Sequence, residues 1–459
     1  MITRRAFLWT AVGLSGAGVL AACAPTAAPA PTVAPVPTAT VGAVPTAGVQ
    51  AAPRVPNAEE ASQYAGQRVT VSTFDGGTLL FANLHDAMAA RFIADTGIQA
   101  QVLRQTFNPS EALVSMQNAL AAQSPDVDVM KIDVIWPGLL GAGLVDLNPT
   151  LGAEAKQHYP AIIQNNTVDG RLVGMPWFAD MAMLYYRTDL LEKYGLSGPP
   201  RTWEELEQQS NSIIEGEKGP NPDFTGFVFQ GVASEALTCN VLEWLASTGG
   251  GTIVENGRVT IDNPQAVTIL NRIGGWTGKI APHSVTSYAE EDARTAFQTG
   301  NAAFMRNWAY AYGLANAPDS PIRGKVAVAP LPASPGFKPV TTVGGWQLVV
   351  NKYSRSPRAA IEWVRYATGP EVQTYQALVG SLGPTIPAVA TRQDVLQAEP
   401  FLTALQDTVR VTRPAGVFGQ HYDDASTVIY RGVNQVLNGQ DAGRVLSDVQ
   451  VQLERLLGS

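Results

Sequence analysis

The sequence predicts an α/β fold with a mostly parallel sheet. Strand and helix patterns alternate from residue 68 onward, starting with expected strands at 69–74, 98–103 and 127–136 and expected helices at 79–93 and 109–122. In open sheets of this kind, ligands bind beyond the carboxyl ends of the strands. The polar side chains at these ends are Asp75, Arg104 and Asp133, which are therefore candidates for contact with a ligand.

The alternation continues to the C-terminus, and the length of 459 residues favours two or three domains. Further strands are expected at 181–186, 224–231, 300–308, 326–331 and 341–351. Further helices are expected at 203–217, 234–247, 264–278, 290–299, 356–368, after the break at Gly369-Pro370, and at 422–437 and 442–457.

The composition argues against nucleic-acid binding and against a metal site. The net charge is −8, and it becomes −10 once residues 1–22, which carry two arginines and no acid, are removed. An acidic chain without a basic run repels phosphates. The histidines are scattered without ligand spacing, so we expect no metal and no cofactor.

The N-terminus has the features of an export signal followed by a lipid attachment site. Residues 1–22 begin with Arg4-Arg5, which resembles a twin-arginine signal, and continue as a short apolar run. The run ends in Leu20-Ala21-Ala22-Cys23, which resembles a lipobox, so Cys23 is expected to be lipidated. An ordinary signal peptide that happens to contain a cysteine is the alternative. Residues 23–57, rich in Pro, Ala and Thr, would tether an extracytoplasmic protein to the membrane.

Four further segments carry a family resemblance. They are DGRLVGMPWFADMAMLYYRTDLL (169–191), AFQTGNAAFMRNWAYAYG (296–313), VGGWQLVVNKYSRSPRAAIEWVRYATGPEVQ (343–373) and RPAGVFGQHYDDASTVIYRGVNQVLNGQ (413–440). Together they resemble the extracellular solute-binding subunits of carbohydrate ABC importers, the maltose-binding-protein-like group. Within this group the segments are most similar to those of trehalose and maltose binders.

The resemblance implies the type II periplasmic-binding-protein fold, in which two α/β lobes joined by a hinge enclose a ligand cleft. We expect the chain to cross between lobes near 176–180, 305–308 and 368–371. The first lobe would then comprise residues 58–176 and 308–368, and the second lobe residues 177–305 and 369–459.

The same resemblance implies a set of residues that contact a sugar. Asp180 would accept hydroxyl hydrogens beside Phe178, Trp308 and Trp346 would stack on the sugar, and Gly345 would let the backbone approach it. A loop or N-cap acid, core aromatic residues and a tight turn are the respective alternatives.

Other candidates carry open alternatives as well. Arg413 matches an arginine that reaches the sugar from the second lobe, and a surface arginine is its alternative. Asp133 could instead cap the helix that follows it. The candidates Asp75, Arg104, Glu235 and Asn240 could equally be solvated or capping residues, and the loop after Asp75 departs from the family pattern. We expect Cys239 to be an inert core residue.

The expected function is reversible, non-catalytic capture of a disaccharide or oligosaccharide by a monomer, which delivers it to the permease subunits of an ABC transporter. A lipid-anchored glycoside hydrolase is the main alternative, because Asp133, Asp180 and Glu235 could supply an acid and a base. A surface adhesion lipoprotein is a second alternative. No nucleophile elbow, HExxH or phosphate loop occurs in the sequence.

Overall fold

The computed structural model describes residues 51–73, 79–104 and 109–458. All of these residues belong to one unit of the chain, Val49–Ser459. The expected signal, Cys23 and most of the tether lie outside the described residues, as does Asp75.

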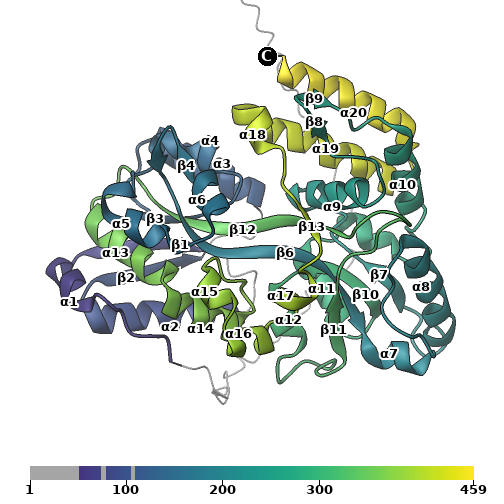
Figure 1. The fold of residues 1–459 in the computed structure, drawn as a ribbon, viewed down its shortest axis with the longest axis horizontal. Coiled ribbons are helices and arrows are strands. Elements are labelled where there is room, and N and C mark those ends of the chain that lie inside the picture. Colours follow the sequence, from purple (N-terminus) through teal and green to yellow (C-terminus); the bar gives the residue numbers. More distant parts are fainter. Residues whose placement is uncertain (1–50, 74–78, 105–108, 459) are drawn as a thin grey trace, which may run out of the picture. The chain divides into compact units, whose positions relative to one another are not determined.

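A nine-stranded sheet forms the centre of this unit (Figure 1). Its main path runs β2-β1-β3-β12-β6-β10-β7, with β11 paired to β6 and β13 paired to β12. The strands are β1 (Arg68–Thr73), β2 (Gln99–Arg104), β3 (Val129–Asp133), β6 (Met175–Arg187), β7 (Thr225–Val228), β10 (Ala302–Trp308), β11 (Val326–Ala329), β12 (Val340–Val350) and β13 (Val409–Val411). Two small hairpins pair β4 (Thr167–Val168) with β5 (Arg171–Leu172) and β8 (Val254–Glu255) with β9 (Arg258–Val259).

The sheet is mixed, which corrects the expectation of a mostly parallel sheet. Strands β1–β3, which are separated by α2 (Leu79–Thr96) and α3 (Pro109–Ala121), pair in parallel as their alternation predicts. The long strands β6 and β12 instead pair antiparallel to each other, and β6 also pairs antiparallel to β10 and β11. The partners β10, β11 and β12 lie far from β6 in the chain, so no single crossover helix sets their direction relative to β6.

Helices cover the sheet on both sides of the long strands. They are α1 (Ala58–Ala61), α2 (Leu79–Thr96), α3 (Pro109–Ala121), α4 (Pro137–Leu140), α5 (Asn148–Ala155), α6 (Pro160–Asn165), α7 (Thr188–Lys193), α8 (Trp203–Glu217), α9 (Glu235–Ala246), α10 (Pro264–Gly274), α11 (Glu290–Gln298), α12 (Tyr310–Ala315), α13 (Pro357–Thr368), α14 (Pro370–Gly380), α15 (Pro387–Ala390), α16 (Gln393–Ala398), α17 (Phe401–Ala404), α18 (Ala415–Phe418), α19 (Tyr422–Leu437) and α20 (Ala442–Leu457). Short 3₁₀ turns occur at η1 (Ser62–Tyr64), η2 (Gly141–Gly143), η3 (His283–Ser287) and η4 (Gly419–His421).

Several helices begin where the sequence supplies a capping side chain. Thr202, Asn263 and Asp441 each accept a backbone N–H bond at the start of α8, α10 and α20, with distances of 3.1, 2.9 and 2.9 Å. Such caps satisfy N–H groups that have no partner within the helix. The starts of these helices are therefore determined locally, close to where the sequence predicts them.

The long strands β6 and β12 connect two groups of elements (Figure 1). We call the group around β1–β3, α2, α3 and α13 the first half, and the group around β7, β10, β11, α8–α11, α19 and α20 the second half. Residues from Met175 to Met181 of β6 pair with β12, whereas Ala182–Arg187 pair with β10 and β11. A large apolar cluster includes Phe92 and Trp363, and another includes residues of α9, α10, α19 and α20.

Two elements pack differently from what the expected lobe boundaries imply. Strand β11 pairs with Leu184–Arg187 of β6. The predicted boundaries place β11 in the first lobe and this part of β6 in the second. Helix α14 packs against α2 and α13, although residues from 369 onward were assigned to the second lobe.

Candidate functional site

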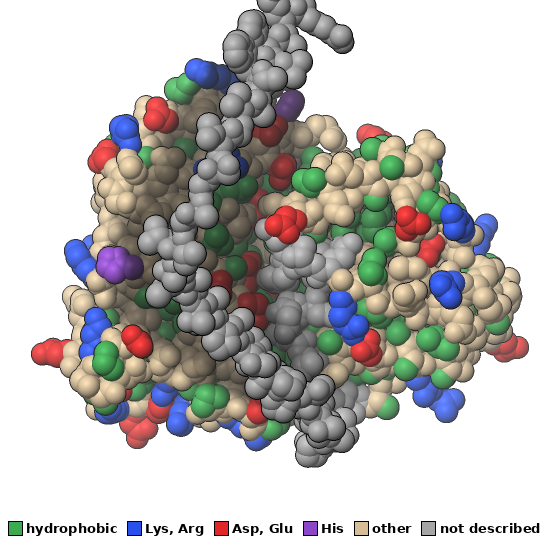
Figure 2. Space-filling model, turned by 180° about the vertical axis from the view of Figure 1, so that it is seen from behind, with side chains coloured by type: hydrophobic (Ala, Val, Ile, Leu, Met, Phe, Trp, Pro, Cys, Tyr) green, Lys and Arg blue, Asp and Glu red, His purple; other side chains and the backbone are tan. Residues whose placement is uncertain are grey.

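A cavity lies where β3, β6, β10 and β12 meet the start of α9. It encloses about 830 Å³ not filled by atoms, including open solvent at its mouth. Its lining residues are Phe81, His85, Pro109, Lys131, Asp133, Phe178, Asp180, Glu235, Ala236, Cys239, Glu290, Trp308, Tyr310, Gly344, Gly345, Trp346, Leu382 and Arg413. In the face drawn in Figure 2, acidic side chains are visible within a hollow of the surface.

The floor of the cavity is formed by adjacent residues of β6 and β12. Gly344 pairs with Asp180 and Trp346 pairs with Phe178, and the register shifts directly after Trp346. Gly345 has a φ of +130°, and a Cβ there would lie 2.6 Å from the backbone oxygen of Phe178. Only glycine fits both constraints, so at this position the backbone of β12 can lie close to the backbone of β6.

Asp180 is a buried carboxyl group at the junction of the two halves. Its Oδ1 accepts backbone N–H bonds from Met181 at 3.0 Å and from Ala309 at 2.9 Å. The residue is only 8% exposed. This burial raises the pKa of Asp180 from 3.8 to about 7, because loss of solvent disfavours the charged form more than the two N–H bonds favour it. Near neutral pH the group can therefore accept hydrogen bonds or donate one.

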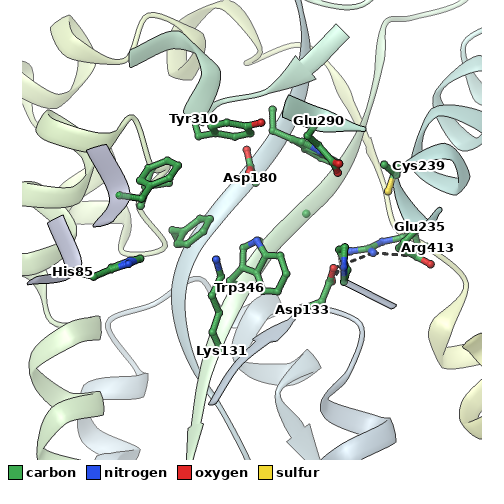
Figure 3. A pocket seen from close by; sticks show the side chains of 18 residues that line it. His85, Lys131, Asp133, Asp180, Glu235, Cys239, Glu290, Tyr310, Trp346 and Arg413 are labelled. Atoms are coloured by element: carbon green, nitrogen blue, oxygen red, sulfur yellow. Dashed lines mark hydrogen bonds and ion pairs between the residues drawn. The ribbon is translucent and has the colours of Figure 1, made fainter. Parts of the chain in front are cut away.

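A buried ion-pair group joins Asp133, Glu235 and Arg413 (Figure 3). Arg413 donates to both oxygens of Asp133 at 3.2 and 2.6 Å, and to Oε1 of Glu235 at 3.0 Å. Tyr422 and Ser426 also donate to Glu235. Burial raises the pKa of Glu235, while the guanidinium of Arg413 and the two hydroxyl donors oppose this shift. The three charged groups come from the end of β3, the start of α9 and the segment after β13, so the ion-pair group links both halves.

Aromatic rings supply much of the remaining wall. Trp308 is the last residue of β10 and Tyr310 is the first residue of α12. Trp346 lies edge-on to Trp136 with ring centroids 6.0 Å apart. The ammonium group of Lys131 lies 4.2 Å from the centroid of the Trp346 ring. The cavity thus combines aromatic faces with groups of both charges, a combination suited to polar ligands with apolar faces.

The structure brings eight of the eleven predicted ligand-binding residues into this cavity: Asp133, Phe178, Asp180, Glu235, Trp308, Gly345, Trp346 and Arg413. Asn240 does not line it. Its side chain is buried and donates to the carbonyl of Gln230 at 2.7 Å. Arg104 does not line it either, and forms an exposed ion pair with Asp86 at 2.6 Å. Asp75 lies outside the described residues.

Sequence reasoning missed several lining residues that local patterns could have indicated. Lys131 stands two residues before Asp133 in β3, and alternate residues of a strand share a face. Tyr310 follows Trp308 by two residues in a segment that carried the family resemblance. Cys239 is buried as expected, but it also lines the cavity, because it lies one helical turn after Glu235 on α9. Glu290, at the start of α11, had no distinguishing sequence signal.

Neither a metal site nor a membrane-spanning helix is found in the described part of the chain. No group of three or more His, Cys, Asp or Glu side chains there is arranged to hold a metal ion. None of the helices in the described ranges is both long and apolar enough to cross a bilayer.

The fold and cavity together define a protein that binds a polar solute in a cleft. The chain belongs to the bacterial extracellular solute-binding protein family, whose model matches residues 82–374. It is 48% identical over 368 residues to a probable ABC transporter-binding protein of Deinococcus radiodurans, covering 79% of this chain and 88% of that relative.

Solved structures show the same architecture. The maltose-bound MalE3 of T. maritima is 35% identical, with a TM-score of 0.79 over 85% of this chain and 100% of that one. The GacH receptor of Streptomyces glaucescens, solved unliganded and with acarbose, has a TM-score of 0.74 over 86% of this chain and 99% of that one. At 22% identity, this second likeness supports the fold alone.

The fold is therefore that of the type II periplasmic binding proteins. The chain is a solute-binding subunit of an ABC transporter, a non-enzymatic component of an extracellular or periplasmic family. The glycoside hydrolase alternative is set aside.

Proposed function

We propose that the chain captures a disaccharide-sized glucoside, such as maltose or trehalose, and delivers it to the permease of a carbohydrate ABC importer. The observation that carries this proposal is the cavity itself, in which Trp308 and Trp346 stand beside the buried carboxyl group of Asp180. The 35% identity to a maltose-bound protein supports the same class of ligand.

In the proposed complex, the rings cover the apolar CH faces of the sugar and the charged groups engage its hydroxyls. Asp180 accepts hydroxyl hydrogens at the floor, and Arg413 donates to sugar oxygens from the side of the second half. A sugar with a missing or inverted hydroxyl would leave one of these buried groups unpaired. Because such a group loses its solvation without compensation, the cavity discriminates between sugars.

We further propose that ligand binding closes the two halves around β6, β12 and β13. The contacts of α14 with α2 favour a third crossing later than the 368–371 predicted from the sequence, at β13. The ion-pair group supports this arrangement, because Asp133 belongs to the first half whereas Glu235 belongs to the second.

The proposed setting is the outer face of the cell membrane. Lipidation at Cys23 would anchor the protein, and the residues between Cys23 and Ala52 would hold the binding unit away from the bilayer. The predicted tether to residue 57 is too long at its end, because Ala52 and Val55 are buried against the folded unit. The protein would act there as a monomer beside its permease.

Calorimetric titration of the purified protein with maltose, trehalose and sucrose tests the proposal. We expect saturable binding of at least one of these sugars with unchanged sugar recovered afterwards. Absence of binding to all three would overturn the proposed ligand class. Release of glucose or fructose would overturn non-catalytic capture.

A further inference from the structure

Arg306 lies behind one of the two cavity tryptophans. It precedes Trp308 by two residues in β10, so both side chains project from the same face of the strand. The guanidinium carbon lies 4.2 Å from the centroid of the Trp308 ring. Trp308 lines the cavity, whereas Arg306 does not line it and is 2% exposed. One face of the ring is therefore covered by a buried cation.

The guanidinium itself is held in one orientation by two side chains. Its Nε and Nη2 donate to the two oxygens of Glu243 at 3.0 and 2.6 Å, and its Nη1 donates to Gln230 at 2.9 Å. The paired, planar contact with Glu243 fixes the plane of the guanidinium as well as its position. Asn240, which was expected in the cleft, instead supports this group by donating to the carbonyl of Gln230 at 2.7 Å.

Glu243, which holds the Arg306 guanidinium, also contacts the strand β12 at the floor of the cavity. Glu243 accepts the backbone N–H of Thr342 in β12 at 3.1 Å. Two residues further along β12, a Cβ at Gly344 would lie only 3.2 Å from the Trp308 ring. The guanidinium thus covers one face of the indole, while the outer edge of its six-membered ring lies against the strand that carries Gly345 and Trp346.

We propose that Arg306 is a positioning residue for sugar recognition, whose guanidinium, fixed by Glu243, holds the Trp308 ring in the orientation that stacks on the ligand. This inference rests on the proposed function for the nature of the ligand. A ring that is already ordered loses less conformational freedom when the sugar binds, which improves affinity. A planar cation supports an indole face better than a point charge does.

The variant Arg306→Lys removes the planar group but keeps a cation beside Glu243. Arg187→Lys is the matched control, because Arg187 is a buried arginine of β6 paired to Asp189 at 2.7 and 2.6 Å, away from the cavity. We expect Arg306→Lys to weaken maltose binding by about two- to tenfold, the range given by immobilising one side chain on binding. The control should bind maltose as the unsubstituted protein does.

A double-mutant cycle separates positioning from general structural damage. If Arg306 acts through the indole, its substitution should change maltose affinity much less in a Trp308→Phe background. Equal losses of affinity in both backgrounds would overturn the inference.

A ligand-free measurement keeps this inference distinct from the proposed function. In ¹⁵N-tryptophan-labelled protein, the indole resonance of Trp308, assigned by its loss in Trp308→Phe, should shift or broaden in Arg306→Lys and stay in place in Arg187→Lys. An unchanged resonance would overturn the positioning role, whether or not maltose binds. If the resonance moves but the unsubstituted protein binds no sugar, the proposed ligand class fails while the placement of the ring by Arg306 stands.

Discussion

Replacing Asp180 with asparagine should stabilise the protein at pH 8 and weaken sugar binding at the same time. The carboxyl group is buried and has a pKa raised to about 7. The Oδ1 atom of an asparagine can still accept the N–H bonds that Met181 and Ala309 now donate. The substitution therefore removes a buried charge but keeps the local hydrogen bonds.

The sign of the pH dependence follows from the two states of Asp180. Its pKa of about 7 in the fold lies above the ordinary value of 3.8, so between these values the folded protein binds more protons than the unfolded chain. Stability from this group is therefore lost as the pH rises from about 4 to 7. Linkage gives a penalty of about 2 kcal/mol at pH 5 and about 4 kcal/mol at pH 8.

Urea unfolding of both proteins at pH 5 and pH 8 measures this difference directly. The stability advantage of Asp180→Asn should grow by about 2–3 kcal/mol between the two pH values. Asp407→Asn, which removes an equal charge from an exposed position, should show no such growth. An advantage of Asp180→Asn that is the same at both pH values would refute the reasoning about burial.

The effect on binding should have the opposite direction. A hydrogen bond to a charged acceptor contributes about 1.5–3 kcal/mol, so we expect maltose affinity at pH 8 to fall by about tenfold or more. Unchanged affinity in calorimetry would remove Asp180 from the proposed contacts.

Three further substitutions test the cavity, each by calorimetry with maltose and by urea unfolding. Trp308→Ala should weaken binding by about tenfold and lose less stability than the core variant Trp363→Ala, which should lose about 3–5 kcal/mol. A large stability loss in Trp308→Ala would instead identify a core role. Gly345→Ala should cost about 1–3 kcal/mol and weaken binding. Gly336→Ala, at a φ of +89° with open space around it, isolates the backbone part of that cost. Arg413→Met should cost about 3–5 kcal/mol, because it leaves two buried carboxylates without their cation, and unchanged stability would contradict the ion-pair group.

Much of the local structure follows from short stretches of sequence. Helix α8 covers the predicted residues because Thr202 caps its start and its apolar residues recur at helical spacing. The same holds for α20, which starts after the cap of Asp441. The directions in which the strands pair and the packing of the helices were predicted less well from the sequence. The pairing of β6 with β12 joins residues far apart in the chain, and no neighbouring residue encodes whether that pairing is parallel or antiparallel.

The cavity residues were predicted mainly from the segments that carry the family resemblance. Asp180, Trp308 and Trp346 all came from such segments and all line the cavity. Lys131 was missed although it shares a strand face with Asp133, because that face is seen only once the direction of the cavity is known. Asn240 was predicted to face the cleft because of its position on α9. Its side chain instead donates to the carbonyl of Gln230, whose own side chain accepts from Arg306 behind Trp308.

The sequence alone determined most helices and strands, because helix caps and apolar patterns depend on residues close together in the chain. The resemblance of whole segments to a known family indicated the type of fold and most of the residues that line the cavity. Tertiary structure decided how those residues act. Asp133 and Arg413 are 280 positions apart, and only folding brings them to 2.6 Å. Likewise, the shifted pKa of Asp180 depends on burial, which is a property of the packed sheet around it.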